Sequence, residues 1–295
     1  MITHLHIEPS SYCNASCPGC PRNGYGYPLQ GLFKETNLSL GDCKKLFEKF
    51  PNIKFVTYCG NHGDPMMHPD ISDIVEIAKG DQHISTNGSI GRLETYNKLA
   101  RLGCVITFGI DGLENTNHLY RQGVKWANLM ERAKTFIKAG GRAKWQFILF
   151  EHNKHQLEQA KALSEQLGFD EFILRDTVRD HMPVIGKDKT ISHWILPADG
   201  SGQPYHIDVD DYLKMRMTEY QTNLRYKVDE IDCEYERGWM YVNAEGELFP
   251  CCFQGFGHPD RPKYRIEDFS TLKATWQTDS CNQICAETCG KNVHT

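Results

Sequence analysis

Short apolar runs alternate with helical patterns over the first 175 residues, and this alternation constrains the fold more than any other feature. The six strand-like runs are His4–Glu8, Lys54–Cys59, His83–Thr86, Val105–Ile110, Trp145–Phe150 and Glu171–Leu174. Apolar residues at helical spacing predict helices at Leu40–Phe50, Ile71–Ala78, Leu93–Leu102, Trp126–Ala139 and Lys154–Leu167, the last two closed by Gly140 and Gly168. This order predicts βαβ units and a parallel sheet. Six units are too few for the eight-fold barrel, so we expect an α/β fold with a partial (β/α)6 TIM-like barrel. The strand runs are nearly continuous in apolar character, as expected when helices cover one face and a packed interior the other.

The alternation of strand-like runs and helical patterns stops after Leu174. Residues 175–230 are rich in proline and glycine and predict a long connection, with one helix around Asp210–Tyr220. Gly238–Val242 and Glu247–Pro250 flank a turn and predict a β-hairpin. We therefore expect a barrel over residues 1–215 and a small hairpin-plus-helix module over residues 216–295.

Composition excludes several classes of protein. The chain of 295 residues is 40% hydrophobic and carries a formal net charge of −5, which argues against a nucleic-acid partner. It has no apolar run near twenty residues and no secretory signal, so we expect no membrane partner and a cytoplasmic location.

Twelve cysteines are unusual for such a chain. In a reducing compartment they favour metal ligation over disulfides. Cys43, Cys59 and Cys104 are scattered among core-like residues and predict simple burial. The others form two clusters, Cys13, Cys17 and Cys20 near the N-terminus and Cys233, Cys251, Cys252, Cys281, Cys285 and Cys289 near the C-terminus.

The N-terminal cluster follows directly on the first predicted strand. A zinc site would want a fourth ligand, whereas three thiolates in one short loop suit a [4Fe–4S] cluster with one open iron. The spacing Cys13-x3-Cys17-x2-Cys20 at this place in a βα barrel resembles the radical SAM enzymes. The resemblance implies that these three cysteines hold a catalytic cluster, to which S-adenosyl-L-methionine (SAM) binds.

Four further segments resemble SAM-binding loops of that family. Residues 60–65 are similar to its Gly-Gly-Glu-Pro segment, whose backbone binds the amino group of SAM. The other three segments are residues 85–88, 109–112 and 120–123, which lie at or after the ends of the third and fourth predicted strands. Two departures stand out: Gly109 replaces a serine that commonly contacts SAM, and Gly19 replaces an aromatic residue, whose ring we expect Tyr12 or Tyr25 to supply. The implied cofactor-binding residues are Tyr12, Gly60, Asn61, His62, Gly63, Asp64, Thr86, Asn87, Gly109, Asp111 and Arg121.

The resemblance also implies a mechanism. An electron from the reduced cluster cleaves SAM to methionine and a 5′-deoxyadenosyl radical, and the radical abstracts hydrogen from a substrate C–H bond. An external donor such as flavodoxin or ferredoxin supplies the electron.

The C-terminal cluster resembles the auxiliary iron–sulfur modules called SPASM and twitch. Cys233, twelve residues, Gly246, four residues and Cys251 match the opening of these modules. Six cysteines cannot ligate two cubanes fully, so the resemblance implies one auxiliary [4Fe–4S] cluster, completed by two of Cys281, Cys285 and Cys289. Cys252 should point to the opposite face of its strand and pack. A structural zinc is the alternative.

The substrate is less constrained. An auxiliary cluster implies a two-electron oxidation of a small molecule such as a sugar or aminocyclitol. The alternatives are crosslinking, epimerisation or side-chain oxidation of a peptide or protein, and a non-catalytic electron-transfer protein. The short N-terminus before Cys13 disfavours a leader-peptide domain. Polar residues that could meet a substrate, or merely form salt bridges on a solvated rim, are Arg175, Asp176, Arg179, His181, Tyr205, His206 and Asp208.

Overall fold

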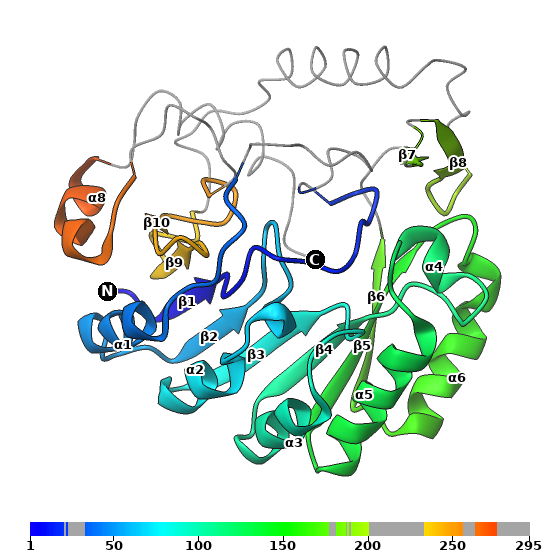
Figure 1. Cartoon of the computed structure of the whole chain (residues 1–295), viewed down its shortest axis with the longest axis horizontal. Helices are drawn as coiled ribbons and strands as arrows, with labels where there is room; N and C mark the ends of the chain where they lie inside the picture. The colour runs from blue at the N-terminus through cyan, green and yellow to red at the C-terminus, as the bar shows by residue number, and fades with distance from the viewer. Residues whose placement is uncertain are drawn as a thin grey trace.

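Eight strands form one curved sheet in the order β10-β9-β1-β2-β3-β4-β5-β6 (Figure 1). The computed structural model describes residues 1–20, 22, 33–176, 181–186, 188, 190–200, 233–255 and 263–275. All neighbours in the sheet are parallel except β9 and β10. The strands are β1 (His4–Ile7), β2 (Phe55–Tyr58), β3 (Asp81–Thr86), β4 (Val105–Gly109), β5 (Arg142–Leu149), β6 (Glu171–Asp176), β9 (Trp239–Val242) and β10 (Leu248–Phe249).

Helices cover the outer face of this sheet, and at least one helix follows each of the strands β1 to β5 (Figure 1). Ser39 begins α1 by accepting a hydrogen bond from the Asp42 amide, and Gly168 ends α6 in the left-handed conformation. The α-helices and the short 3-10 helices, labelled η, are α1 (Leu40–Lys49), η2 (Pro65–Met67), α2 (Ile71–Ile77), α3 (Leu93–Arg101), α4 (Asn117–Tyr120), α5 (Trp126–Lys138), η3 (Lys154–Gln156), α6 (Leu157–Leu167), η5 (Ile266–Asp268) and α8 (Phe269–Thr275).

The two faces of the strands differ in chemistry. Leu5 and Ile7 of β1 are fully buried in the core shared with the helices. Many of the alternate residues are polar and half-buried, and this polar inner-face set comprises His4, His6, Thr57, His83, Ser85, Thr107 and Gln146. The interpretation of these strands as nearly continuously apolar is therefore wrong, because polar and apolar side chains alternate between the two faces. A barrel active site lies at the carboxyl ends of its strands. The polar inner face extends along the strands to those ends.

The six parallel strands, the five predicted helices and the hairpin are confirmed, with ends shifted by a few residues. Several elements were not predicted, among them the short helices α4 and η2 and the antiparallel pair β7 (Met182–Ile185) with β8 (Ile191–Ile195). The hairpin also does more than expected, because β9 pairs with β1 and extends the barrel sheet. The predicted helix at Asp210–Tyr220 and the boundary near residue 215 lie outside the described residues.

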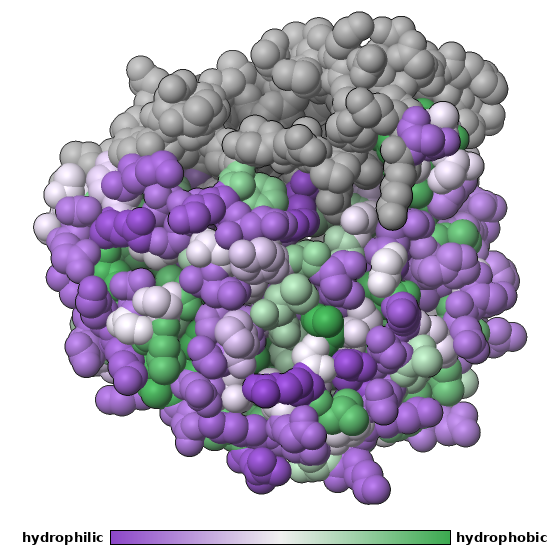
Figure 2. Space-filling model, viewed as in Figure 1, coloured by the Kyte–Doolittle hydropathy of each residue, from purple (hydrophilic) through white to green (hydrophobic). Residues whose placement is uncertain are grey.

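Figure 2 shows one face of the molecule, on which polar residues dominate the described surface and apolar ones are scattered among them. Scattered apolar residues are normal on a protein surface. In the described part of the chain, every helix is too short or too polar to cross a membrane.

Candidate active site

The three N-terminal cysteines lie in the loop that follows β1. The Cys20 amide donates a hydrogen bond to the Cys17 carbonyl at 3.0 Å, and the Ala15 amide approaches Cys13 Sγ at 3.4 Å. Cys17 is buried, and Cys13 and Cys20 are half-buried. Burial, followed by the nearby Asp64 carboxylate, raises the pKa of the Cys13 thiol to about 12. Iron binding at this thiol must therefore displace its proton.

Asp64 fastens the loop after β2 to its neighbours on both sides. Its amide donates to the Tyr12 carbonyl at 2.9 Å, next to the first cysteine. Its buried carboxylate accepts hydrogen bonds from the Thr86 hydroxyl at 2.7 Å and from the amides of Asn87 and Met66 at 2.8 and 2.9 Å. Burial raises the pKa of Asp64 in spite of these donors. Asp64 and Thr86, both expected to contact a cofactor, are thus engaged with each other.

The loop after β3 contacts the cysteine loop directly. Asn87 Nδ2 donates to Asn14 Oδ1 at 2.9 Å and lies 3.9 Å from Cys13 Sγ. Asn14 in turn donates to the Ser89 hydroxyl at 2.8 Å. The predicted site residues of β1 and β3 are therefore brought together.

The loop after β4 carries a buried ion pair. Asp111 is fully buried and accepts from Arg121 Nε and from the Ile148 amide, both at 2.6 Å. Burial lowers the pKa of Arg121, but Asp111 and the nearby Cys17 raise it more, so the guanidinium keeps its charge. Arg121 Nη1 lies 3.9 Å from Cys17 Sγ. A Cβ at Gly109 would lie only 2.6 Å from Arg121 Nη2, which explains why a glycine stands here.

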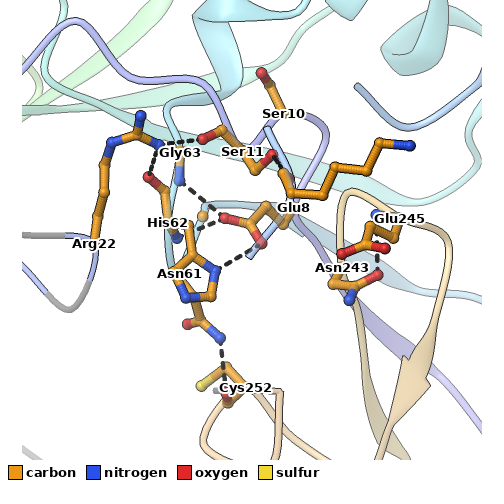
Figure 3. Close-up of polar contacts among 12 residues, drawn as sticks. Glu8, Ser10, Ser11, Arg22, Asn61, His62, Gly63, Asn243, Glu245 and Cys252 are labelled. Carbon is orange, nitrogen blue, oxygen red and sulfur yellow. Dashed lines mark hydrogen bonds and ion pairs between the residues drawn. The ribbon is translucent and has the colours of Figure 1, made fainter. Parts of the chain in front are cut away.

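Glu8 is a central residue that the sequence did not predict (Figure 3). Its Oε1 accepts hydrogen bonds from the amides of His62 and Gly63 at 2.6 and 2.9 Å, and its Oε2 accepts one from the Tyr241 hydroxyl at 2.8 Å. A Cβ at Gly63 would clash with the Ser10 carbonyl, and one at Gly60 would lie 2.7 Å from Glu8 Oε1. Close approach therefore requires both glycines. The sequence held one sign of this role, because Glu8 is an acidic residue that continues the alternation of inner-face side chains along β1.

The side chains of Asn61 and His62 also have partners within the protein. Asn61 Nδ2 donates to the Cys252 carbonyl at 2.8 Å (Figure 3). The His62 ring stacks on Phe33 at 4.2 Å, and its carbonyl accepts from Arg22 at 3.1 Å. Tyr12 is half-buried and its amide donates to the Ser10 hydroxyl, whereas Tyr25 lies outside the described residues.

The donor set at the cysteine loop fits an iron–sulfur cluster better than a single ion. Among the described residues, no three His, Cys, Asp or Glu side chains converge on one point that would suit one metal ion. A cubane places each thiolate on a separate iron, and three thiols on one short loop meet that need. The amide of Asn87 and the guanidinium of Arg121 supply polar neighbours to two of the sulfurs.

The other cysteines divide into core and hairpin residues. Cys43 and Cys104 are buried as predicted, whereas Cys59, directly after β2, is only half-buried. No disulfide joins any two of the nine described cysteines. Cys233 and Cys251 flank the β9–β10 hairpin and are half-buried, while Cys281, Cys285 and Cys289 lie outside the described residues. The strand argument for Cys252 is wrong, because β10 ends at Phe249 and Cys252 lies in a turn.

The candidate substrate residues are only partly described. Arg175 and Asp176 are exposed and belong to the end of β6, and buried His181 packs near Trp194 of β8, with ring centroids 6.1 Å apart. Arg179, Tyr205, His206 and Asp208 lie outside the described residues.

Comparison with known proteins settles the family. The sequence profile of the Radical SAM superfamily matches residues 7–162, more than half of the chain. The chain belongs to the radical SAM superfamily. Its fold is similar to Streptococcus suis SuiB bound to S-adenosylmethionine, with a TM-score of 0.65, 16% identity, and coverage of 96% of this chain and 68% of SuiB.

Native anSMEcpe with bound AdoMet is also similar, with a TM-score of 0.59, 14% identity, and coverage of 96% of this chain and 82% of that one. No curated protein matches the sequence. At these identities the solved structures show the fold, and the family profile shows that this radical SAM protein is an enzyme whose family uses a [4Fe–4S] cluster and SAM.

Proposed function

We propose that this radical SAM enzyme cleaves SAM reductively and removes hydrogen from a polar substrate. The observation that carries the proposal is the convergence of the loops after β2, β3 and β4 on the cysteine loop after β1. When bound, the cluster and SAM supply an electron and a 5′-deoxyadenosyl radical, which takes hydrogen from a C–H bond. Cys13, Cys17 and Cys20 hold the cluster, the backbone of residues 60–63 receives the amino group of SAM, and Arg121 offers a cation to its carboxylate.

We further propose a two-electron oxidation of a small polar molecule such as a sugar or aminocyclitol. The half-buried polar residues of the inner face, among them His6, His83 and Thr107, suit hydroxyl-rich substrates. One auxiliary [4Fe–4S] cluster in residues 216–295, held by Cys233, Cys251 and two later cysteines, would take the second electron. A flavodoxin or ferredoxin would supply the first.

A peptide substrate is the second candidate. Solved structures of similar fold include SuiB bound to precursor peptide SuiA and anSMEcpe bound to the Cp18Cys peptide. Deuterium transfer into 5′-deoxyadenosine distinguishes the two candidates. Transfer from C-deuterated aminocyclitols or sugars supports the small-molecule proposal, and transfer only from a labelled peptide supports the second.

The cysteine assignment is tested with anaerobically reconstituted enzyme. Addition of dithionite and SAM should yield 5′-deoxyadenosine with the wild type, and Cys13→Ala, Cys17→Ala or Cys20→Ala should abolish it, because each removes an iron ligand. Cys104→Ala, a buried cysteine in the core, is the matched control and should retain cleavage. Full cleavage by any of the three loop variants would refute the assignment.

A further inference from the structure

Two contacts join residues 60–63, here called the SAM loop, to residues 239–255, here called the C-terminal hairpin. The first runs through Glu8. One oxygen of its carboxylate accepts hydrogen bonds from the amides of His62 and Gly63 (Figure 3), and the other accepts one from the Tyr241 hydroxyl. Tyr241 lies on β9, which pairs with β1. One buried carboxylate therefore bonds to segments more than 170 residues apart in the sequence.

The Glu8 carboxylate restricts the positions of the groups that donate hydrogen bonds to it. Glu8 is 1% exposed, and a buried charge is costly unless hydrogen bonds satisfy it. Tyr241 is fully buried and its ring packs edge-on to His6 at 5.0 Å, so the hydroxyl position is fixed by the sheet. Tyr241 thereby fixes one oxygen of Glu8, and the other oxygen fixes the direction of two SAM-loop amides.

The second contact is independent of the first. Asn61 is 8% exposed and donates from Nδ2 to the Cys252 carbonyl at 2.8 Å. Cys252 follows Cys251, a candidate ligand of the auxiliary cluster.

We propose that the C-terminal hairpin sets the conformation of the SAM loop through two positioning residues, Glu8 and Asn61, and thereby sets the affinity for SAM. The inference rests on the proposed role of residues 60–63 in SAM binding. By linkage, occupation of the SAM loop must stabilise the hairpin by the same factor. The hairpin thus serves the SAM site as well as any auxiliary cluster.

Amide hydrogen exchange of the full chain without SAM tests the contact itself. Tyr241→Phe removes one donor to Glu8 and keeps the ring, and exchange across residues 60–63 should quicken by about tenfold, as expected for loss of a hydrogen bond to a charged group. Tyr58→Phe is the matched control, since Tyr58 is equally buried but donates to Gln82 on the outer face of the sheet. It should leave this exchange unchanged.

SAM binding to the reconstituted protein, measured by calorimetry without reductant, tests the consequence. Tyr241→Phe and Asn61→Gly should each raise the Kd for SAM by about 2- to 13-fold, the range expected for one lost hydrogen bond. In a Glu8→Gln background the effect of Tyr241→Phe should shrink, because it acts through Glu8. A purely structural role of Tyr241 would instead give additive effects.

The experiments distinguish a failure of the proposed coupling from a failure of the proposed function. If the wild type binds SAM and neither variant changes Kd or loop exchange, the coupling is overturned and the proposed function stands. If the wild type does not bind SAM, the assignment of the SAM loop fails, and faster exchange in Tyr241→Phe would still support the contact through Glu8.

Discussion

Gly109 and Arg121 show how a single residue can depart from a family pattern for a packing reason. The guanidinium of Arg121 lies over Gly109 and is held there by Asp111 at 2.6 Å. Gly109→Ser should destabilise the fold by about 1–3 kcal/mol, because the pinned guanidinium has to move to admit a Cβ. Urea unfolding measures this loss, with Gly41→Ser as the comparison, because an added Cβ at Gly41 meets only the Ser39 hydroxyl at 3.7 Å. Equal losses in the two variants would contradict the packing argument.

Glu8 predicts an acid-dependent loss of stability. Burial raises the pKa of Glu8, but the hydrogen bonds and charge of His62 and the hydrogen bond of Tyr241 together outweigh burial and lower it. His6 and Cys59 also face this carboxylate. Because the native pKa lies below the unfolded pKa of about 4.3, ionised Glu8 stabilises the fold above that pH. This stabilisation is lost as the pH falls through the native pKa. The stability advantage of wild type over Glu8→Gln should therefore be constant near pH 7 and shrink below about pH 4.3, as urea unfolding would show. An advantage that grows on acidification would refute this.

Residues of the site differ in how far the sequence can reveal them. Cys13, Cys17 and Cys20 are close in the sequence, so their spacing predicts shared chemistry. Glu8 is not predictable in this way, because its meaning depends on Tyr241, 233 positions away. Asp64 was expected to face a cofactor, yet its carboxylate binds Thr86 and Asn87, a pairing that only the neighbouring strands create.

At the scale of elements, periodicity predicted the strands and helices that pack against each other. It missed β7 because Pro183 lies within it and proline is rare in strands. It also missed the polar inner face, although the alternation of polar and apolar residues in His4–Ile7 is visible in the sequence. The hairpin was predicted from its turn, but its place beside β1 was not.

The hairpin element carries the prediction of an auxiliary cluster. Reconstituted wild-type protein should contain about eight irons per chain, and Cys233→Ala should reduce this to about four, because only the N-terminal cubane would remain. Iron, sulfide and zinc analysis of both proteins checks this. About four irons in the wild type would contradict a second cluster, and one zinc besides them would identify the structural-zinc alternative.

At the scale of the molecule, the sheet joins the two ends of the chain. Strand β9 pairs along the whole of β1, from His4 with Trp239 to Ile7 with Val242, and so covers an edge that a six-stranded barrel would leave open (Figure 1). Pairing between segments this far apart leaves no local pattern in the sequence. The proposed division into residues 1–215 and 216–295 therefore separates two strands of one sheet.

This arrangement predicts that residues 1–215 do not fold alone. Truncation removes, among others, the buried side chains of Met240, Tyr241, Val242 and Leu248, and each buried apolar side chain contributes about 1.5–3 kcal/mol. Their sum is comparable to the whole stability of a domain, about 5–15 kcal/mol, and β1 would become an exposed edge that favours aggregation. Circular dichroism melting and light scattering of the truncated protein should show no cooperative unfolding and large particles. A monomer with a cooperative transition within a few degrees of the full chain would instead establish residues 1–215 as an independent domain.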